Sequence, residues 1–419
     1  KRQIVVGKPK QSRLIYMFIP TKQAARNSLE SFIPKCGSIY TAYRNYDRED
    51  ISNSTVSRIS PWIRNRTLPE WDVIDAVLKE HSATAASKFI DEVLWRTYWK
   101  GWLQLRPSIW EGYQQDLAKL CESYSNYSKY TKAIQSRSGI DCFDIWNREL
   151  IDNNYLHNHA RMWYASIWIH TLKLPWQLGA DWFLRNLFDG DPASNTLSWR
   201  WVAGLHTQGK SYLAKRDNIL KYTENRFKVD VALANEAIDI DPVDHPSPNI
   251  LEEFPLIPEG KRLGLLVTLE DLSAIDWLDK KAGSVAQAGY FPLDAYKKHN
   301  MAPSVIKFHQ ESMINQMDKN IPLFTDQDAA KVLEWIKAES LDGIIIAEPP
   351  IGPTQASLKS LVTSLEPAGT ICYWARHWWD ATLYPYATHG FFRFKKAIPS
   401  AISQLKVNLL KSKQQSLGI

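Results

Sequence analysis

The first half of the chain shows helical periodicity. Up to about Tyr222, apolar residues recur at every third or fourth position, for example over residues 160–174 and 182–188. Few stretches alternate apolar and polar residues as strands do. We therefore expect an all-helical domain over residues 1–235.

A change of composition marks the end of this pattern. Residues 239–248 and 254–260 are rich in Pro and Asp and have no hydrophobic period. Such segments are typical of connections between domains. We place a linker at residues 236–260 and a second domain at residues 261–419.

The second domain has a different pattern, in which short apolar runs alternate with helical segments. Residues 263–269, 343–347 and 371–374 predict buried strands, and residues 325–328 predict the start of a helix. The apolar stripe of that helix is formed by Ala329, Val332, Leu333 and Ile336. Alternating strands and helices predict a parallel sheet, so the expected fold class is all-α followed by a smaller Rossmann-like α/β domain.

Composition adds limits to this picture. The chain has 419 residues, of which 44% are hydrophobic, enough for large cores. A net charge of +6 favours a polyanionic partner without requiring one. The four cysteines lack metal-ligand spacing, no apolar run is long enough to cross a membrane, and no signal peptide is evident. We expect a cytoplasmic protein without a metal and without a membrane partner.

Residues 89–99 carry the first group of candidate functional residues. Helical spacing places Phe89, Glu92 and Arg96 on one face, with Trp95 beside them. In a segment standing alone, a ring, an acid and a base on one face would fit a solvated surface stripe equally well.

A second group lies in an aromatic helical segment. Arg161 and Met162 lie three and four residues after Asn158, a spacing of one helical turn. Burying polar groups without partners costs about 1–3 kcal/mol each, so these groups need partners. A bound cofactor is one possible source of them.

A third group surrounds Gly190. Asp189 and Asp191 flank this glycine, and Asn195 and Trp199 follow at successive helical turns. The Asp-Gly-Asp segment alone also suits a turn or a calcium loop. No further oxygen ligands follow at EF-hand spacing, so we discount a metal.

In this order, and together with residues 57–62 and 138–139, the three groups resemble the FAD-binding domain of photolyases and cryptochromes. The resemblance covers most of residues 25–226. It implies a bent FAD molecule held in a bowl of helices. The alternative is an all-α bundle whose motif matches are accidental.

The resemblance implies which residues hold the cofactor. The residues matching the phosphate site are Tyr40, Arg44, Ser57, Arg58, Ile59 and Ser60. Hydroxyls and free backbone N–H groups at the start of a helix suit an anion. The other residues matching the cofactor site are Phe89, Arg96, Asn158, Arg161, Asp189, Asp191 and Asn195. Among them, Asn195 matches the residue facing flavin N5.

The same resemblance implies a substrate. Glu92 matches the acid that hydrogen-bonds a pyrimidine dimer, and Trp95 matches an aromatic wall for bases extruded from the duplex. Asn158 and Met162 are the residues found in enzymes specific for cyclobutane dimers. The implied activity is light-driven repair of such dimers by a monomer that binds damaged DNA.

The resemblance also has implications for electron supply to the flavin and for the order of the domains. Trp199 and Trp176 match the inner and middle members of a tryptophan chain that photoreduces the flavin, while the outer member is left open between Tyr124 and Tyr130. Residues 374–396 resemble the end of a photolyase antenna domain, which suggests a rearranged domain order. An unrelated Rossmann-like domain is the alternative, and no motif in it identifies an antenna chromophore.

Two other functions remain open within this resemblance. One is a cryptochrome-like photoreceptor that binds FAD without repairing DNA. The other is a flavin-dependent protein that acts on single strands or RNA. Retention of Glu92, Trp95, Asn158 and Met162 favours repair over the photoreceptor.

Overall fold

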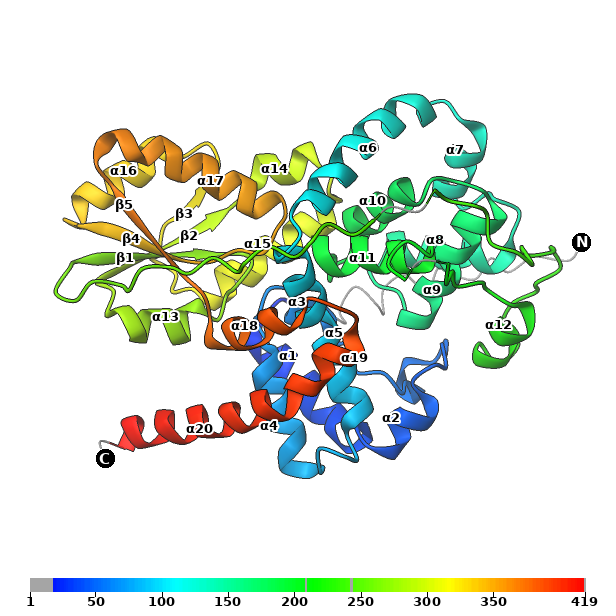
Figure 1. Ribbon diagram of the computed structural model, residues 1–419, viewed down its shortest axis with the longest axis horizontal. Helices are drawn as coiled ribbons and strands as arrows, with labels where there is room; N and C mark the ends of the chain where they lie inside the picture. The colour runs from blue at the N-terminus through cyan, green and yellow to red at the C-terminus, as the bar shows by residue number, and fades with distance from the viewer. Residues whose placement is uncertain (1–17, 208, 242–243, 418–419) are drawn as a thin grey trace, which may run out of the picture.

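The computed structural model describes residues 18–207, 209–241 and 244–417. Residues 1–17, on which the expectation about a signal peptide depends, lie outside the described residues, as do residues 242–243 of the expected linker and residues 418–419. Helices form one side of the molecule and a five-stranded sheet with its own helices forms the other (Figure 1). Among the described helices, none combines the length and apolarity needed to cross a bilayer.

The helical half confirms the periodicity of the sequence. Its helices are α1 (Lys22–Phe32), α2 (Ser38–Tyr43), α3 (Ser60–Arg64), α4 (Glu70–Glu80), α5 (Ser87–Gln104), α6 (Ser108–Tyr124), α7 (Ser128–Ile134), α8 (Asp141–Asn153), α9 (Asn158–Ser166), α10 (Trp176–Asn186), α11 (Pro192–Val202) and α12 (Arg216–Tyr222). A π-helical turn, Ile167–Thr171, extends α9. Side-chain caps begin several helices; Thr21 accepts a hydrogen bond from the Ala24 amide at α1, and Asp191 accepts one from the Ser194 amide at α11.

The second half contains a parallel sheet, as predicted. Its strands are β1 (Leu263–Thr268), β2 (Ala286–Phe291), β3 (Leu323–Thr325), β4 (Gly343–Ala347) and β5 (Ile371–Ala375), in the order β3-β2-β1-β4-β5. In register, Leu265 pairs with Gln287 on one side and with Ile345 on the other. β1 and β4 are buried at every position, which explains their uninterrupted apolar sequences.

Two layers of helices cover the sheet. They are α13 (Ala274–Ala282), α14 (Leu293–Lys298), α15 (Pro303–Gln316), α16 (Ala329–Ala338) and α17 (Pro353–Leu365). Side chains of α16 and α17 form a separate core with one face of the sheet. The other face, with α13 and α15, belongs to the same continuous core as the helical half. The two halves are therefore packed together as one body of protein.

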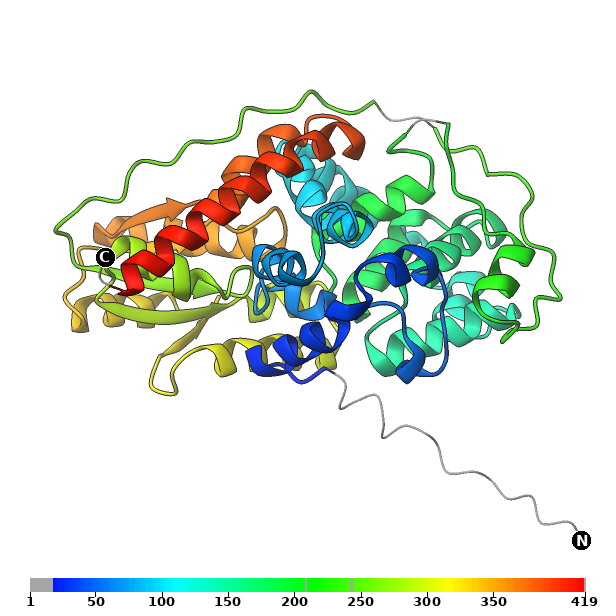
Figure 2. The same cartoon turned by 90° about the horizontal axis from the view of Figure 1, so that it is seen from below.

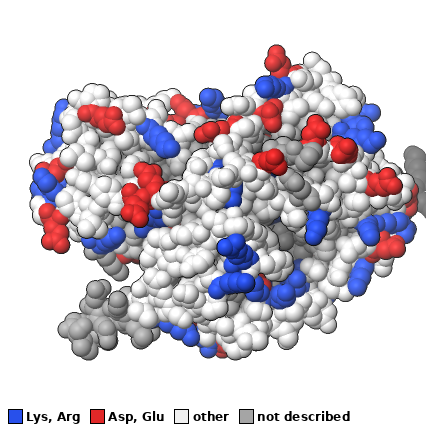
Figure 3. All heavy atoms as spheres, in the orientation of Figure 1, with Lys and Arg blue, Asp and Glu red and all other residues white. Residues whose placement is uncertain are grey.

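After β5 the chain returns to the helical half. It forms α18 (Trp378–Leu383), α19 (Phe391–Phe394) and α20 (Ile398–Leu417), with α18 and α19 against α5 and α20 against α4 (Figure 2). The indole N–H of Trp379 donates to the Thr97 hydroxyl of α5. Lys and Arg side chains gather over α19 on the face drawn in Figure 3.

Buried ion pairs join the two halves where β1 ends. Arg64 pairs with Glu270 at 2.7 Å, and Arg66 pairs with Asp271 at 3.0 Å and with Asp380 at 2.6 Å. In open parallel sheets, ligands commonly bind beside the carboxyl ends of the strands, where the strand order reverses. Here arginines of the helical half contact the carboxyl end of β1.

Candidate functional site

Helix α5 brings four of the predicted site residues together. Phe89 is buried, and its ring meets the Tyr40 ring of α2 edge to face with centroids 5.2 Å apart. Glu92 follows one turn later and Trp95 and Arg96 two turns later, and all three are partly exposed. The helical spacing predicted from the sequence thus places these groups along one wall.

Arg44 and Glu92 face each other across this wall. The guanidinium Nε lies 3.8 Å from the carboxylate, and both side chains remain partly accessible to solvent. Burial raises the pKa of Glu92, while the nearby Arg44 cation opposes the rise. A partly exposed carboxyl with a raised pKa can accept or donate a hydrogen bond to a polar ligand.

Two more ion pairs fix the Asp-Gly-Asp turn before α11. Arg161 donates to Asp189 at 2.9 Å, and Arg96 pairs with Asp191. Burial alone would raise the pKa of each acid, but the arginines outweigh it and leave both pKa values below their ordinary range. Both acids are therefore held as carboxylates in a buried position.

The loop before α3 approaches the same acids. Ser60 is close enough to Asp189 to help lower the pKa of its carboxyl. Arg58 and Arg161 both lie over the Tyr155 ring, with their guanidinium carbons 5.7 and 5.4 Å from its centroid. Ser57 is partly exposed and Ile59 is buried. The predicted phosphate loop and the start of α9 are thus neighbours in space.

Helix α9 and helix α11 contribute the remaining predicted residues. Asn158 is exposed at the first position of α9, and Met162 is partly exposed one turn later. Asn195 is buried, and its amide donates to the Ala180 carbonyl at 2.7 Å. This bond fixes the orientation of the Asn195 amide.

Unsatisfied buried polar atoms indicate room for a ligand's hydrogen bonds. Within the part of the chain that the structure describes, Asp189 Oδ1 and Ser194 Oγ are buried without a hydrogen-bond partner. Leaving such atoms unpaired costs about 1–3 kcal/mol each. A cofactor that carries both donors and acceptors, as FAD does, fits this set of residues.

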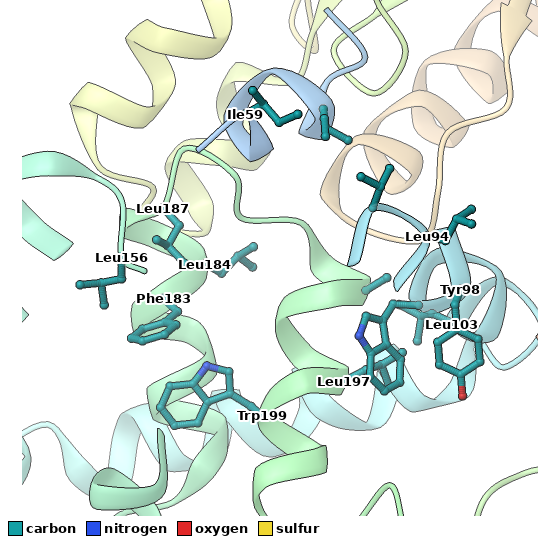
Figure 4. Close-up of a cluster of buried hydrophobic side chains, with 14 of the residues drawn as sticks. Ile59, Leu94, Tyr98, Leu103, Leu156, Phe183, Leu184, Leu187, Leu197 and Trp199 are labelled. Atoms are coloured by element: carbon teal, nitrogen blue, oxygen red, sulfur yellow. The ribbon is translucent and has the colours of Figure 1, made fainter. Parts of the chain in front are cut away.

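Aromatic rings surround Trp199. Figure 4 shows this ring of α11 beside Phe183 of α10, and their centroids lie 5.1 Å apart. The ring centroids of Trp199 and Trp168 lie 6.2 Å apart, and those of Trp168 and Tyr130 lie 6.0 Å apart. A Cβ atom at position 179 would lie 2.3 Å from the Trp199 ring, so only glycine permits this packing. Trp176 stacks on Tyr113 at 5.6 Å.

The sequence reasoning missed two of these neighbours. Trp168 was not singled out, although it lies on the same helical segment as Asn158. Phe391 of α19 was also missed; its ring stacks on Trp95 with centroids 3.9 Å apart and an interplanar angle of 11°. The aromatic and basic composition of residues 391–396 was the only local signal for this contact.

The segment that carries most of this site also matches a known family profile. Residues 89–232 match the profile described as the FAD binding domain of DNA photolyase. This segment of the chain is therefore similar in sequence to the FAD-binding domain of DNA photolyase.

Individual proteins are also similar to the chain. The chain is 26% identical over 218 residues to the deoxyribodipyrimidine photo-lyase of Streptomyces griseus, covering 48% of this chain and 47% of that protein. It is 28% identical over 197 residues to that of Alkalihalophilus pseudofirmus, covering 46% and 39%. The similarity to the Escherichia coli protein is 24% over 215 residues, covering 50% and 44%. The matches thus span less than half the length of these relatives.

A solved structure is also similar. It is described as a bacterial class III photolyase from Agrobacterium tumefaciens, with a TM-score of 0.41 and 22% sequence identity. The match covers 52% of this chain and 45% of that chain.

Proposed function

We propose that the protein binds FAD in the bowl formed by α2, α5, α9 and α11 and repairs cyclobutane pyrimidine dimers in DNA. The observation that carries the proposal is the convergence of three acid–arginine pairs on one wall: Arg44–Glu92, Arg96–Asp191 and Arg161–Asp189. The chemistry that FAD supplies when bound is light-driven electron transfer, which splits the cyclobutane ring without net redox change.

The cofactor would be held by residues whose partners are incomplete in the protein alone. Asp189 Oδ1 and Ser194 Oγ lack hydrogen-bond partners among the described residues, and both are buried. Ser60 is the first residue of α3 and Ser57 lies in the loop before it, where hydroxyls and backbone N–H groups favour an anionic phosphate. The other residues assigned to the cofactor are Tyr40, Arg44, Arg58, Ile59, Phe89, Arg96, Asn158, Arg161, Asp191 and Asn195.

The substrate role is assigned to the solvent side of the same wall. Glu92 would hydrogen-bond the pyrimidine carbonyls, and its raised pKa favours sharing a proton with them. Trp95 offers an aromatic surface for the extruded bases, and Asn158 and Met162 lie on the adjoining helix. Damaged pairs cost less to unstack, which favours the lesion over undamaged DNA.

A photoreceptor without repair activity is the second candidate. The observation that favours it is the series of rings from buried Trp199 through Trp168 to partly exposed Tyr130. Such a series could carry electrons toward a flavin whether or not DNA is bound. Repair and photoreception share this feature, so only the substrate side separates them.

Replacing Glu92 with Ala should lower repair by roughly tenfold to a hundredfold, because hydrogen bonds to a charged group contribute ~1.5–3 kcal/mol. Flavin content should stay unchanged, since Glu92 lies on the substrate side. The measurement is thymine restored from a thymine-dimer oligonucleotide when the reduced holoprotein is illuminated. Glu311→Ala, which removes a partly exposed acid of α15, is the matched control.

Three outcomes would contradict parts of this assignment. Loss of FAD from the Glu92→Ala protein would move Glu92 to the cofactor side. Unchanged repair would remove its role with the lesion. Absence of repair by the fully loaded wild-type protein, on duplex and single-stranded substrates alike, would favour the photoreceptor.

Replacing Trp199 or Trp168 with Phe should slow photoreduction of the bound flavin at least about tenfold, equivalent to ~1.4 kcal/mol in the activation barrier. Both rings lie in the contact series described above, and Phe is much harder to oxidise. The measurement is loss of visible flavin absorbance under blue light with an external reductant. Trp335→Phe, in the core of the sheet, should leave the rate unchanged. An unaltered rate in Trp168→Phe would assign the second position to Trp176 alone.

A further inference from the structure

A short segment that follows the sheet reaches the edge of the proposed lesion site. We name it the α19 rim and define it as Phe391, Phe392, Arg393, Lys395 and Lys396. Phe391 is buried, and its ring stacks on the Trp95 ring at 3.9 Å. The rim therefore touches the aromatic wall to which the proposed function assigns the extruded bases.

Further contacts hold the rim in place on α5. Lys395 Nζ lies 2.5 Å from Asp91 Oδ2, and Asp91 directly precedes Glu92. The neighbouring Phe394 is buried and packs on Tyr98 with centroids 5.5 Å apart. These contacts fix the backbone of α19 relative to the substrate side of the wall.

The outer face of the rim is both aromatic and cationic. Phe392 is 86% exposed, although a large apolar ring is usually buried. Arg393 and Lys396 beside it are also exposed. Figure 3 shows the Lys and Arg side chains gathered at this part of the surface.

The charge of the surrounding sequence has one sign. Residues 381–419 contain no Asp or Glu. Their cationic residues are Arg393, Lys395, Lys396, Lys406, Lys411 and Lys413. An exposed ring among cations matches a partner that offers stacked planar groups and phosphates. The stacking of Phe391 on Trp95 places this surface beside the proposed lesion site, which favours DNA as that partner.

We propose that the α19 rim grips duplex DNA beside the lesion. Arg393 and Lys396 would contact phosphates, and Phe392 would stack on the base exposed when the dimer leaves the helix. Proteins that distort DNA commonly insert an apolar side chain at the altered step. This inference rests on the proposed function for its substrate and adds the surface that holds the duplex.

The test compares binding of the reduced holoprotein, in the dark, to three DNA probes by fluorescence anisotropy. The probes are a duplex with one thymine dimer, the same duplex without it, and the dimer in a single strand. Phe392→Ala should weaken binding of the damaged duplex roughly tenfold, because stacking on one base is lost. Binding of the single-stranded dimer should change little, since no gap is left in a helix there.

The double substitution Arg393→Gln and Lys396→Gln should act on charge instead. Binding of both duplexes should weaken to a similar degree, and the slope of log affinity against log salt should fall by about two. Arg393→Lys with Lys396→Arg should retain the slope. The control is Ile314→Ala with Lys307→Gln, which removes an exposed apolar side chain and an exposed cation from α15. It should leave the affinity for both duplexes unchanged.

Failure of this inference can be told apart from failure of the proposed function. Unchanged affinity and salt slope in both rim variants would overturn the inference even if the wild-type protein repairs dimers. Weaker duplex binding in the variants would support it even if the wild-type protein repairs nothing. A change of oligomeric state without a change in DNA binding would make the rim a protein contact and also overturn it.

Discussion

Replacing Arg66 with Met is expected to lower the free energy of unfolding by about 3–5 kcal/mol, the cost of leaving buried carboxylates without their partner. Arg66 is 5% exposed and pairs with Glu70 at 3.2 Å, Asp271 at 3.0 Å and Asp380 at 2.6 Å. These acids come from α4, the end of β1 and α18. One guanidinium therefore joins three parts of the chain that are remote in sequence.

Urea unfolding followed by circular dichroism would measure this loss. The control is Lys307→Met, which removes a largely exposed lysine whose pair with Glu311 spans 3.8 Å. Exposed pairs contribute about 0–1 kcal/mol, so this variant should remain close to wild type. Equal stabilities of the two variants would show that the Arg66 cluster contributes little beyond a surface pair.

The same cluster should make the protein sensitive to acid. Burial alone would raise the pKa of Asp380, but Arg66 outweighs it and leaves the pKa below its ordinary value. A carboxyl with a depressed folded pKa stabilises the fold at neutral pH, and this contribution is lost as the pH falls through the ordinary carboxyl range toward the folded pKa. The Arg66→Met protein should lose less stability over this range.

Replacing Asp191 with Asn should weaken FAD binding roughly tenfold to a hundredfold, because a carboxylate bond of ~1.5–3 kcal/mol is lost at the flavin side and Arg96 is left unpaired. Asn still accepts a hydrogen bond at the start of a helix, so the cap on α11 is retained. The substitution therefore tests the charge of Asp191 apart from its capping role. Titration of apoprotein with FAD by calorimetry measures the affinity.

A matched variant separates binding from folding. Asp181 is equally buried and pairs with Arg185 on α10, outside the proposed bowl. Asp181→Asn should reduce stability while leaving FAD affinity close to wild type. If Asp191→Asn bound FAD as tightly as wild type, the Arg96–Asp191 pair would have only a structural role.

The local parts of the site could be predicted from the sequence because they depend on helical spacing. Phe89, Glu92 and Arg96 share a face of α5, and Asp191 begins α11 as the pattern indicated. The strands with uninterrupted apolar sequences, such as β1 and β4, were also predicted. In these elements the positions of apolar residues in the sequence match the positions that are buried.

Other elements could not be predicted because their sequences carry little pattern. β2 contains Ala286, Ala288 and Gly289, which have weak strand propensity. β3 has three residues only. Their strand conformation is imposed by pairing with neighbours in the sheet.

Contacts between distant parts of the chain were equally hidden. No local pattern links Phe391 to Trp95, or Arg64 to Glu270. The middle ring was assigned to Trp176 and the outer one was left open between Tyr124 and Tyr130, whereas the packing of Trp168 joins Tyr130 to Trp199. Tertiary structure, rather than spacing, selects these partners.

Arg64 joins the Asp-Gly-Asp turn to the sheet. Its Nε donates to the Gly190 carbonyl at 2.8 Å, and its two terminal nitrogens hold Glu270 at 2.7 and 3.0 Å. Because one guanidinium is bonded to both segments, the residue Glu270 that follows β1 helps to hold the turn around Gly190 in position. Cutting the chain before β1 would remove Glu270 and Asp271 and expose to water the apolar surface that the helical half shares with the sheet, so we do not expect the helical half to fold on its own.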